Sequence, residues 1–118
     1  MKGKNIQQYI NRLQGYRVHV KEHIEQLQQS EKISESNGHL VENLIKTCLD
    51  SFQLEYKLFE TMPYTDKHRG MGSVRDCINM LNQLRHLKSS KQPILVDHID
   101  FLNEKLFVHF DTVEELLK

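Results

Sequence analysis

The sequence has few of the residues that interrupt helices, since only two prolines and five glycines occur among its 118 residues. Leu, Gln, Lys and Glu are abundant instead, and all four are strong helix formers. Both prolines lie where the apolar pattern breaks off between two segments. The composition therefore predicts an all-α protein.

Long apolar runs are also missing, and none approaches the roughly 20 residues that a membrane-spanning helix needs. The first residues lack the apolar stretch of a secretory signal. Charged residues make up 27% and hydrophobic residues 38% of the chain, which excludes the extremes of disordered and membrane proteins. We expect a cytoplasmic protein without membrane contact, folded as one domain over residues 1–118.

Cysteine is scarce, and the two that occur, Cys48 and Cys77, do not form a C-x-x-C motif. Each lies singly in a helix-like apolar pattern, so we expect two buried thiols in a reducing compartment. A disulfide between them is the alternative, because two apolar faces could bring them together. The sequence leaves their redox state open.

The chain has no excess charge of either sign, since 16 Lys and Arg balance 16 Asp and Glu. A global attraction to nucleic acid or to an acidic membrane is therefore not expected. The distribution is uneven, because residues 64–92 hold six basic and two acidic residues, whereas residues 93–118 hold two basic and six acidic ones. Neighbouring segments are thus oppositely charged.

Apolar residues recur at spacings of three and four along four stretches, which is the pattern of amphipathic helices. The predicted helices cover residues 4–31, 38–62, 73–88 and 93–117. A short polar joint before the last helix favours antiparallel neighbours. We therefore expect a four-helix up-and-down antiparallel bundle in which helix 3 is the shortest.

Turn-forming residues mark the predicted joints. Residues 64–72 contain two glycines and no apolar periodicity, so we expect the longest loop there. Ser73 and Asp76 resemble a capping box at the start of the third helix. Pro93 suits the first turn of the fourth helix, and no stretch predicts a convincing strand.

Seven histidines are a high count for this length, and helical bundles can hold metal in their cores. His19 and His23 have the spacing of a chelating pair, but the glutamate of the metalloprotease motif is missing. A metal or small-ligand site could instead combine His23 and His109, which face the core, with Glu114. The competing interpretation is hydrogen-bonded core or boundary histidines, and we predict no resident cofactor.

A basic segment offers another possibility, which is binding to nucleic acid or to an acidic partner. Its residues are Lys67, Arg69, Arg75, Arg85 and Lys88. Only Tyr64 lies near them, so the aromatic platform of single-strand binders is thin. The favoured interpretation is charge complementarity within the bundle, with the acidic last helix as the partner.

Surplus apolar surface is the feature that most favours a protein partner. The second predicted helix carries apolar residues away from its main stripe, namely Leu40, Leu54, Tyr56 and Leu58. Such a face docks partner helices, unless the core is wide enough to bury it. Phe107 and Phe110 on the last helix are compatible with either core or dimer contact.

No catalytic motif accompanies these features, because the sequence lacks a G-x-S-x-G elbow, a P-loop and a G-x-G-x-x-G motif. We therefore predict a non-enzymatic, protein-binding regulator, inhibitor or chaperone-like adaptor, with a homodimer as one form of partnership. Metal or small-ligand binding through core histidines and nucleic-acid binding through residues 67–91 are the alternatives.

Overall fold

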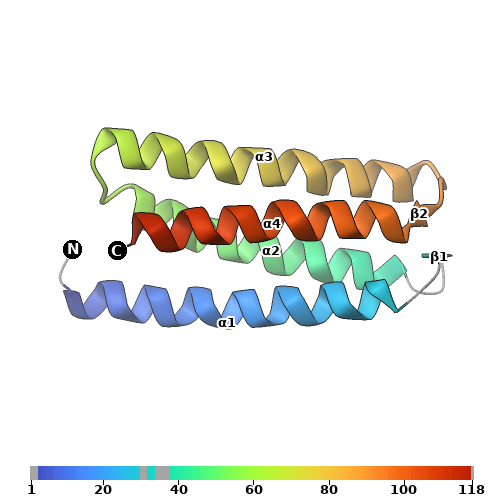
Figure 1. The fold of residues 1–118 in the computed structure, drawn as a ribbon, viewed down its shortest axis with the longest axis horizontal. Coiled ribbons are helices and arrows are strands. Elements are labelled where there is room, and N and C mark those ends of the chain that lie inside the picture. Colours follow the sequence, from blue (N-terminus) through green and yellow to red (C-terminus); the bar gives the residue numbers. More distant parts are fainter. Residues whose placement is uncertain (1–2, 30–31, 34–37, 118) are drawn as a thin grey trace.

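The computed structural model describes residues 3–29, 32–33 and 38–117. These residues form four helices and two short strands, in the order α1 (Gly3–Gln28), β1 (Lys32–Ile33), α2 (Gly38–Phe59), α3 (Tyr64–Ser89), β2 (Ile94–Leu95) and α4 (Val96–Leu116). The helices run side by side along the 46 Å long axis of the molecule, and consecutive helices are antiparallel (Figure 1). The predicted all-α, four-helix bundle is confirmed.

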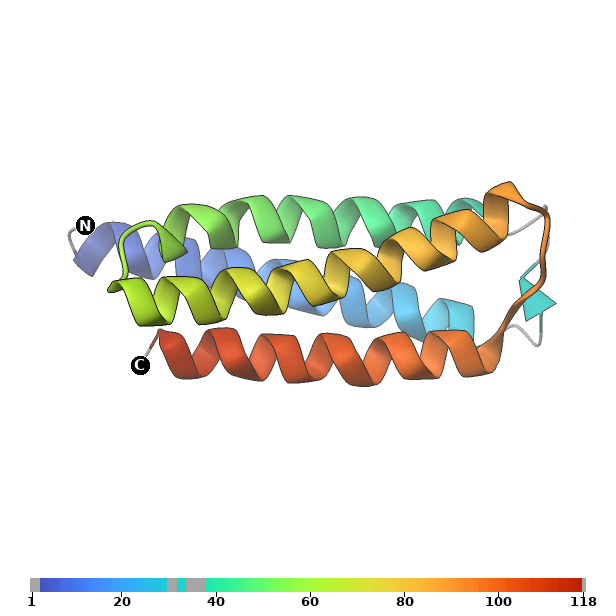
Figure 2. The ribbon, with the colours of Figure 1, turned by 90° about the horizontal axis from the view of Figure 1, so that it is seen from above.

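The helices form a ring in which α1 contacts α2 and α4, and α3 contacts the same two helices. As Figures 1 and 2 show, α1 and α3 lie on opposite sides with α2 and α4 between them. All four contribute apolar side chains to a continuous core, including Val20, Leu44, Leu81 and Leu106. Full burial of a side chain of this size contributes about 1.5–3 kcal/mol, so this core supplies the main driving force for folding.

The third helix differs most from its prediction. α3 has 26 residues, as many as α1, and α4 is the shortest with 21. The expectation that helix 3 is the shortest, preceded by a long loop, is therefore wrong. α3 begins at Tyr64, directly after Pro63, and Ser73 lies inside it rather than capping it.

Gly70 explains why the glycine-containing stretch is helical. Gly70 is buried, and a Cβ atom on it would lie 2.7 Å from the ring of Phe59 on α2. The absent side chain lets α3 approach α2 closely, so this glycine serves packing rather than a turn. At Gly72, no atom lies within 4 Å of the position that a Cβ atom would occupy, so no steric contact requires glycine there.

The end of α3 has a Schellman motif. The Gln92 N–H donates to the Leu87 carbonyl at 2.9 Å, and the Lys91 N–H donates to the Lys88 carbonyl at 3.2 Å. Lys91 has a φ of 59°, in the left-handed region where glycine is favoured. This geometry ends the helix and turns the chain toward β2.

A two-residue strand pair closes one end of the bundle and corrects the expectation of no strand. Lys32 lies opposite Leu95 and Ile33 opposite Ile94 in an antiparallel pairing. The pair ties the α1–α2 connection to the α3–α4 connection. Because β2 follows Pro93, α4 starts only at Val96, and the proline is not in its first turn.

The other helix boundaries shift by a few residues. α1 ends at Gln28 and α2 at Phe59, whereas their predicted ends were residues 31 and 62. Residue 31 itself is outside the described residues. The observed start of α2 at Gly38 confirms the prediction for that end.

Candidate functional site

A hydrogen-bonded network joins three helices inside the core. His109 on α4 lies 2.6 Å from Glu55 on α2 through Nε2, and 2.7 Å from the Ser73 hydroxyl on α3 through Nδ1. The side chains of His109 and Glu55 are 1% and 2% exposed. Because a carboxylate only accepts hydrogen bonds, Nε2–H donates to Glu55, and Nδ1 can accept from Ser73.

Two further contacts complete this network. The Ser51 hydroxyl donates to the second Glu55 carboxylate oxygen at 3.4 Å. The Phe52 ring meets the His109 imidazole edge-on, with 5.3 Å between centroids. The described part of the chain contains no buried side-chain nitrogen or oxygen without a hydrogen-bond partner, so burial of these groups is compensated.

The network contains the residue types of a carboxylate–imidazole–hydroxyl triad, but its setting differs from that of a nucleophile. Neither His109 nor Ser73 lines any of the three surface grooves described below. Ser73 lies within α3, where helical bonding already engages the neighbouring backbone N–H groups that an oxyanion hole would need. The arrangement is suited to holding three helices in one register.

Sequence reasoning placed His109 in the core but missed Glu55 and Ser73. The signal was present in the spacing. Glu55 follows the core residue Phe52 by three positions and precedes Phe59 by four, so it lies on the buried stripe of α2. A charged residue on such a stripe predicts a buried partner.

Both cysteines lie in the same core, as expected, and both are free thiols. Burial raises the pKa of Cys48 far above its ordinary value, and the nearby Cys77 and Glu55 add to the effect. Burial, followed by the Glu55 charge, raises the pKa of Cys77 to about 12. Protonated, buried thiols are poor nucleophiles and poor metal ligands.

The residues of the predicted metal site are not brought together. His23 is half-buried and lies 3.2 Å from the Thr47 hydroxyl, whereas Glu114 is exposed and forms an ion pair with Arg17. Both His109 nitrogens are engaged in the core network. Across residues 3–29, 32–33 and 38–117, no three His, Cys, Asp or Glu side chains are placed to hold one ion.

The flank of the second helix is not a free surface. Leu54 and Leu58 are 4% and 1% exposed and belong to the core, while Leu40 and Tyr56 are half-buried and pack against it. The interpretation of these four residues as an exposed docking face is corrected. The core is wide enough to bury this flank because α2 contacts both α1 and α3.

The basic segment forms several ion pairs within the bundle. Arg69 pairs at 3.0 Å with Glu115 on α4, which is the helix expected to neutralise this segment. Arg85 and Lys88 instead pair with Glu42 on α2, at 3.5 and 3.3 Å. These pairs are partly exposed, and each is worth at most about 1 kcal/mol.

Two of the five basic residues remain without such a partner in the described part of the chain. Lys67 is half-buried and Arg75 is exposed.

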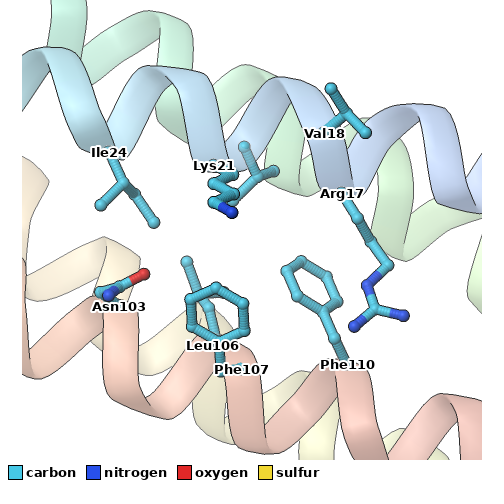
Figure 3. A pocket seen from close by; sticks show the side chains of 9 residues that line it. Arg17, Val18, Lys21, Ile24, Asn103, Leu106, Phe107 and Phe110 are labelled. Atoms are coloured by element: carbon cyan, nitrogen blue, oxygen red, sulfur yellow. The ribbon is translucent and has the colours of Figure 1, made fainter.

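A surface cavity lies between α1 and α4, and we call it the α1–α4 groove. It has a volume of about 180 Å³ and is lined by Arg17, Val18, Val20, Lys21, Ile24, Asn103, Leu106, Phe107 and Phe110. Figure 3 shows Ile24 and Arg17 extending from α1 toward α4, with Ile24 above Asn103 and Arg17 beside Phe110. An apolar cavity of about 150 Å³ can hold benzene, so this one can hold a large apolar side chain.

Exposed apolar groups border this groove. Val18 is 55% exposed and Phe107 is 42% exposed. Arg17 lies over the Phe110 ring, 5.0 Å from its centroid, and forms an ion pair with Glu114 at the groove edge. A smaller cavity of about 30 Å³ continues along the same two helices toward Ile10 and Leu117.

A second groove of about 170 Å³ lies between α3 and α4, and its lining includes Leu84, Leu87 and Phe101. Phe101 is 53% exposed, with the Lys105 ammonium 5.6 Å from its ring centroid. His98 also lines this groove, and its Nδ1 accepts a hydrogen bond from the Leu95 N–H at 2.9 Å, at the start of α4. One of its lining side chains is therefore already used to cap the helix.

Fold and grooves define the chain as a four-helix bundle with open apolar cavities on either side of α4. No family model, curated protein or solved structure matches the chain. None of the described helices combines the length and the apolar character needed to cross a membrane.

Proposed function

We propose that this chain is a non-enzymatic protein-binding bundle that contacts its partner through the α1–α4 groove. The observation that carries the proposal is an apolar cavity of about 180 Å³ with the half-exposed Phe107 at its border. Cavities of this kind accept an apolar anchor residue from a partner, and aromatic residues beside them supply much of the binding energy.

The chemistry of the core supports a binding role over a catalytic one. The most reactive combination in the described chain, His109 with Glu55 and Ser73, is committed to bonds between helices. Both thiols are buried and protonated. We also propose a cytoplasmic location, because two unpaired thiols suit a reducing compartment.

Photo-crosslinking at the groove tests this proposal. In cells that make the protein natively, Phe107→p-benzoylphenylalanine should yield a specific crosslinked product. The matched control is Tyr64→p-benzoylphenylalanine, because Tyr64 is an aromatic residue that is 79% exposed on α3, diagonally opposite α1. Equal crosslinking at both positions, or none at position 107, would contradict a binding role for the groove.

A further inference from the structure

The outward surface of α4 has a central strip that contains only acidic and large apolar side chains, and we call this strip the α4 face. It comprises the helix positions within about 60° of Glu104, since successive residues are about 100° apart. Its acids are Asp97, Asp100, Glu104, Asp111 and Glu115, and all five are exposed. Its apolar residues are Phe101, Phe107 and Val108, which are three of the six exposed large apolar residues in the described chain.

The α4 face lies between the two surface grooves and contributes an aromatic residue to each. Phe107 lines the α1–α4 groove of about 180 Å³ on one side, and Phe101 lines the groove of about 170 Å³ on the other. Val108 follows Phe101 by seven positions, which is two helical turns, so these two residues lie along one line. Apolar side chains of a partner therefore have two cavities to enter and exposed aromatic rings to cover.

Most of the acids on this face have no opposite charge within the chain. Glu115 forms an ion pair with Arg69 of α3, and at the border of the face Glu114 is paired with Arg17 of α1. The other four acids of the α4 face form no ion pair within residues 3–29, 32–33 and 38–117.

The remaining charged residues at the edges do not cancel this excess. At the α1 edge, Lys21 is accompanied by the exposed acids Glu22 and Glu25. At the α3 edge, Lys105 is offset by the exposed Asp76, on the side of α3 that contacts α4. The α4 face therefore keeps a local negative charge, although acidic and basic residues balance over the whole chain.

This charge limits the kinds of partner that can cover the apolar residues. Nucleic acid and anionic membranes would be repelled. A second copy that presented the same face would place acid opposite acid. The basic segment of a second copy is not a better match, because three of its residues, Arg69, Arg85 and Lys88, are already paired within the chain.

We propose that the α4 face docks a positively charged amphipathic segment of a different protein. In helical form, such a segment presents apolar residues at spacings of three and four that can cover Phe101, Phe107 and Val108. Its Lys and Arg side chains then face the unpaired acids, which accelerates association and discriminates against acidic segments. This inference rests on the proposed function, since Phe107 also borders the α1–α4 groove, and it names the chemistry of the partner.

Isothermal titration calorimetry of the full chain with a model peptide tests the charge preference. The peptide consists of the heptad Leu-Lys-Lys-Leu-Leu-Lys-Leu repeated twice, and the matched peptide has Glu in place of every Lys. Only the Lys peptide should bind, in a one-to-one complex that weakens as salt screens the exposed charges. Glu104→Lys combined with Asp111→Lys should weaken this binding by about tenfold or more.

A matched variant on the other side of the bundle separates docking on α4 from general attraction between charges. Asp50→Lys with Glu60→Lys changes the net charge equally, at exposed positions on and just after α2, which lies opposite α4 (Figure 2). This variant should bind the Lys peptide like the wild type, and unchanged circular dichroism spectra will show that all variants are folded. Failure of the Lys peptide to bind, equal binding of the Glu peptide, or equal weakening by both variants would overturn the proposal.

The crosslink at position 107 distinguishes failure of this inference from failure of the proposed function. Its product should be lost when Glu104→Lys and Asp111→Lys are added, and retained when Asp50→Lys and Glu60→Lys are added. A product that responds equally to both pairs of substitutions, or one of twice the chain mass, supports the binding role and overturns the cationic partner. No product in any background overturns both.

Discussion

Replacement of His109 by leucine would leave the Glu55 carboxylate buried, at 2% exposure, with the Ser51 hydroxyl at 3.4 Å as its remaining hydrogen-bond partner in the described structure. Removing the partner of a buried charge, which leaves that charge uncompensated, typically costs about 3–5 kcal/mol. A domain of this size has a total stability of about 5–15 kcal/mol. We therefore expect His109→Leu to lose a large fraction of the free energy of unfolding.

Urea denaturation followed by far-UV circular dichroism measures this loss. With a slope of about 1.5–2 kcal/mol per molar urea, the midpoint should fall by about 2–3 M. In thermal unfolding the corresponding decrease in Tm is about 10–20 °C. Ser73→Ala removes a single hydrogen bond at the edge of the network and should cost only about 0.5–1.5 kcal/mol.

A double-mutant cycle identifies the cause. In Glu55→Leu combined with His109→Leu, no buried charge remains, so the double variant should recover most of the stability that either single variant loses. Two results would refute this reasoning. One is a His109→Leu variant within about 1 kcal/mol of the wild type, and the other is a double variant whose loss equals the sum of the single losses.

Further predictions concern the remaining special positions. Gly70→Ala should destabilise the fold by about 1–3 kcal/mol, because the added methyl group would overlap the buried Phe59 ring. Gly72→Ala should instead stabilise the fold by up to about 1 kcal/mol. Equal urea midpoints for the two variants would contradict this. Lys91→Gly should raise stability by roughly 1 kcal/mol by relieving the left-handed φ of 59°, and a lowered Tm would contradict it. The Cys48 and Cys77 thiols should react with Ellman's reagent at pH 8 only on unfolding. Because burial raises the pKa of Cys77 from 9.0 to about 12, stability should hold below pH 9 and fall between pH 9 and 12, less so in a double Cys→Ala variant.

The number, order and amphipathic character of the helices followed from the sequence alone. Spacings of three and four are a local consequence of the helical repeat, so they can be read without knowledge of the neighbours. The burial of both cysteines and of His109 also followed, because each lies on an apolar stripe. These features depend on one helix at a time.

The features that the sequence predicted wrongly depend on contacts between helices. Gly70 resembles a turn residue in sequence, and only the Phe59 ring packed against it shows why it lies in a helix. The apolar flank of α2 resembles an exposed face, but Leu54 and Leu58 are covered because α2 has neighbours on two sides. Periodicity shows which side chains share a face but not how many helices cover that face.

The candidate surface was likewise decided by tertiary structure. The sequence placed Phe107 and Phe110 together as core or dimer residues, and only the packing of α1 beside α4 left Phe107 half-exposed and Phe110 buried. Local sequence determined the four amphipathic helices, whereas the groove arose only when the first and last helices came into contact.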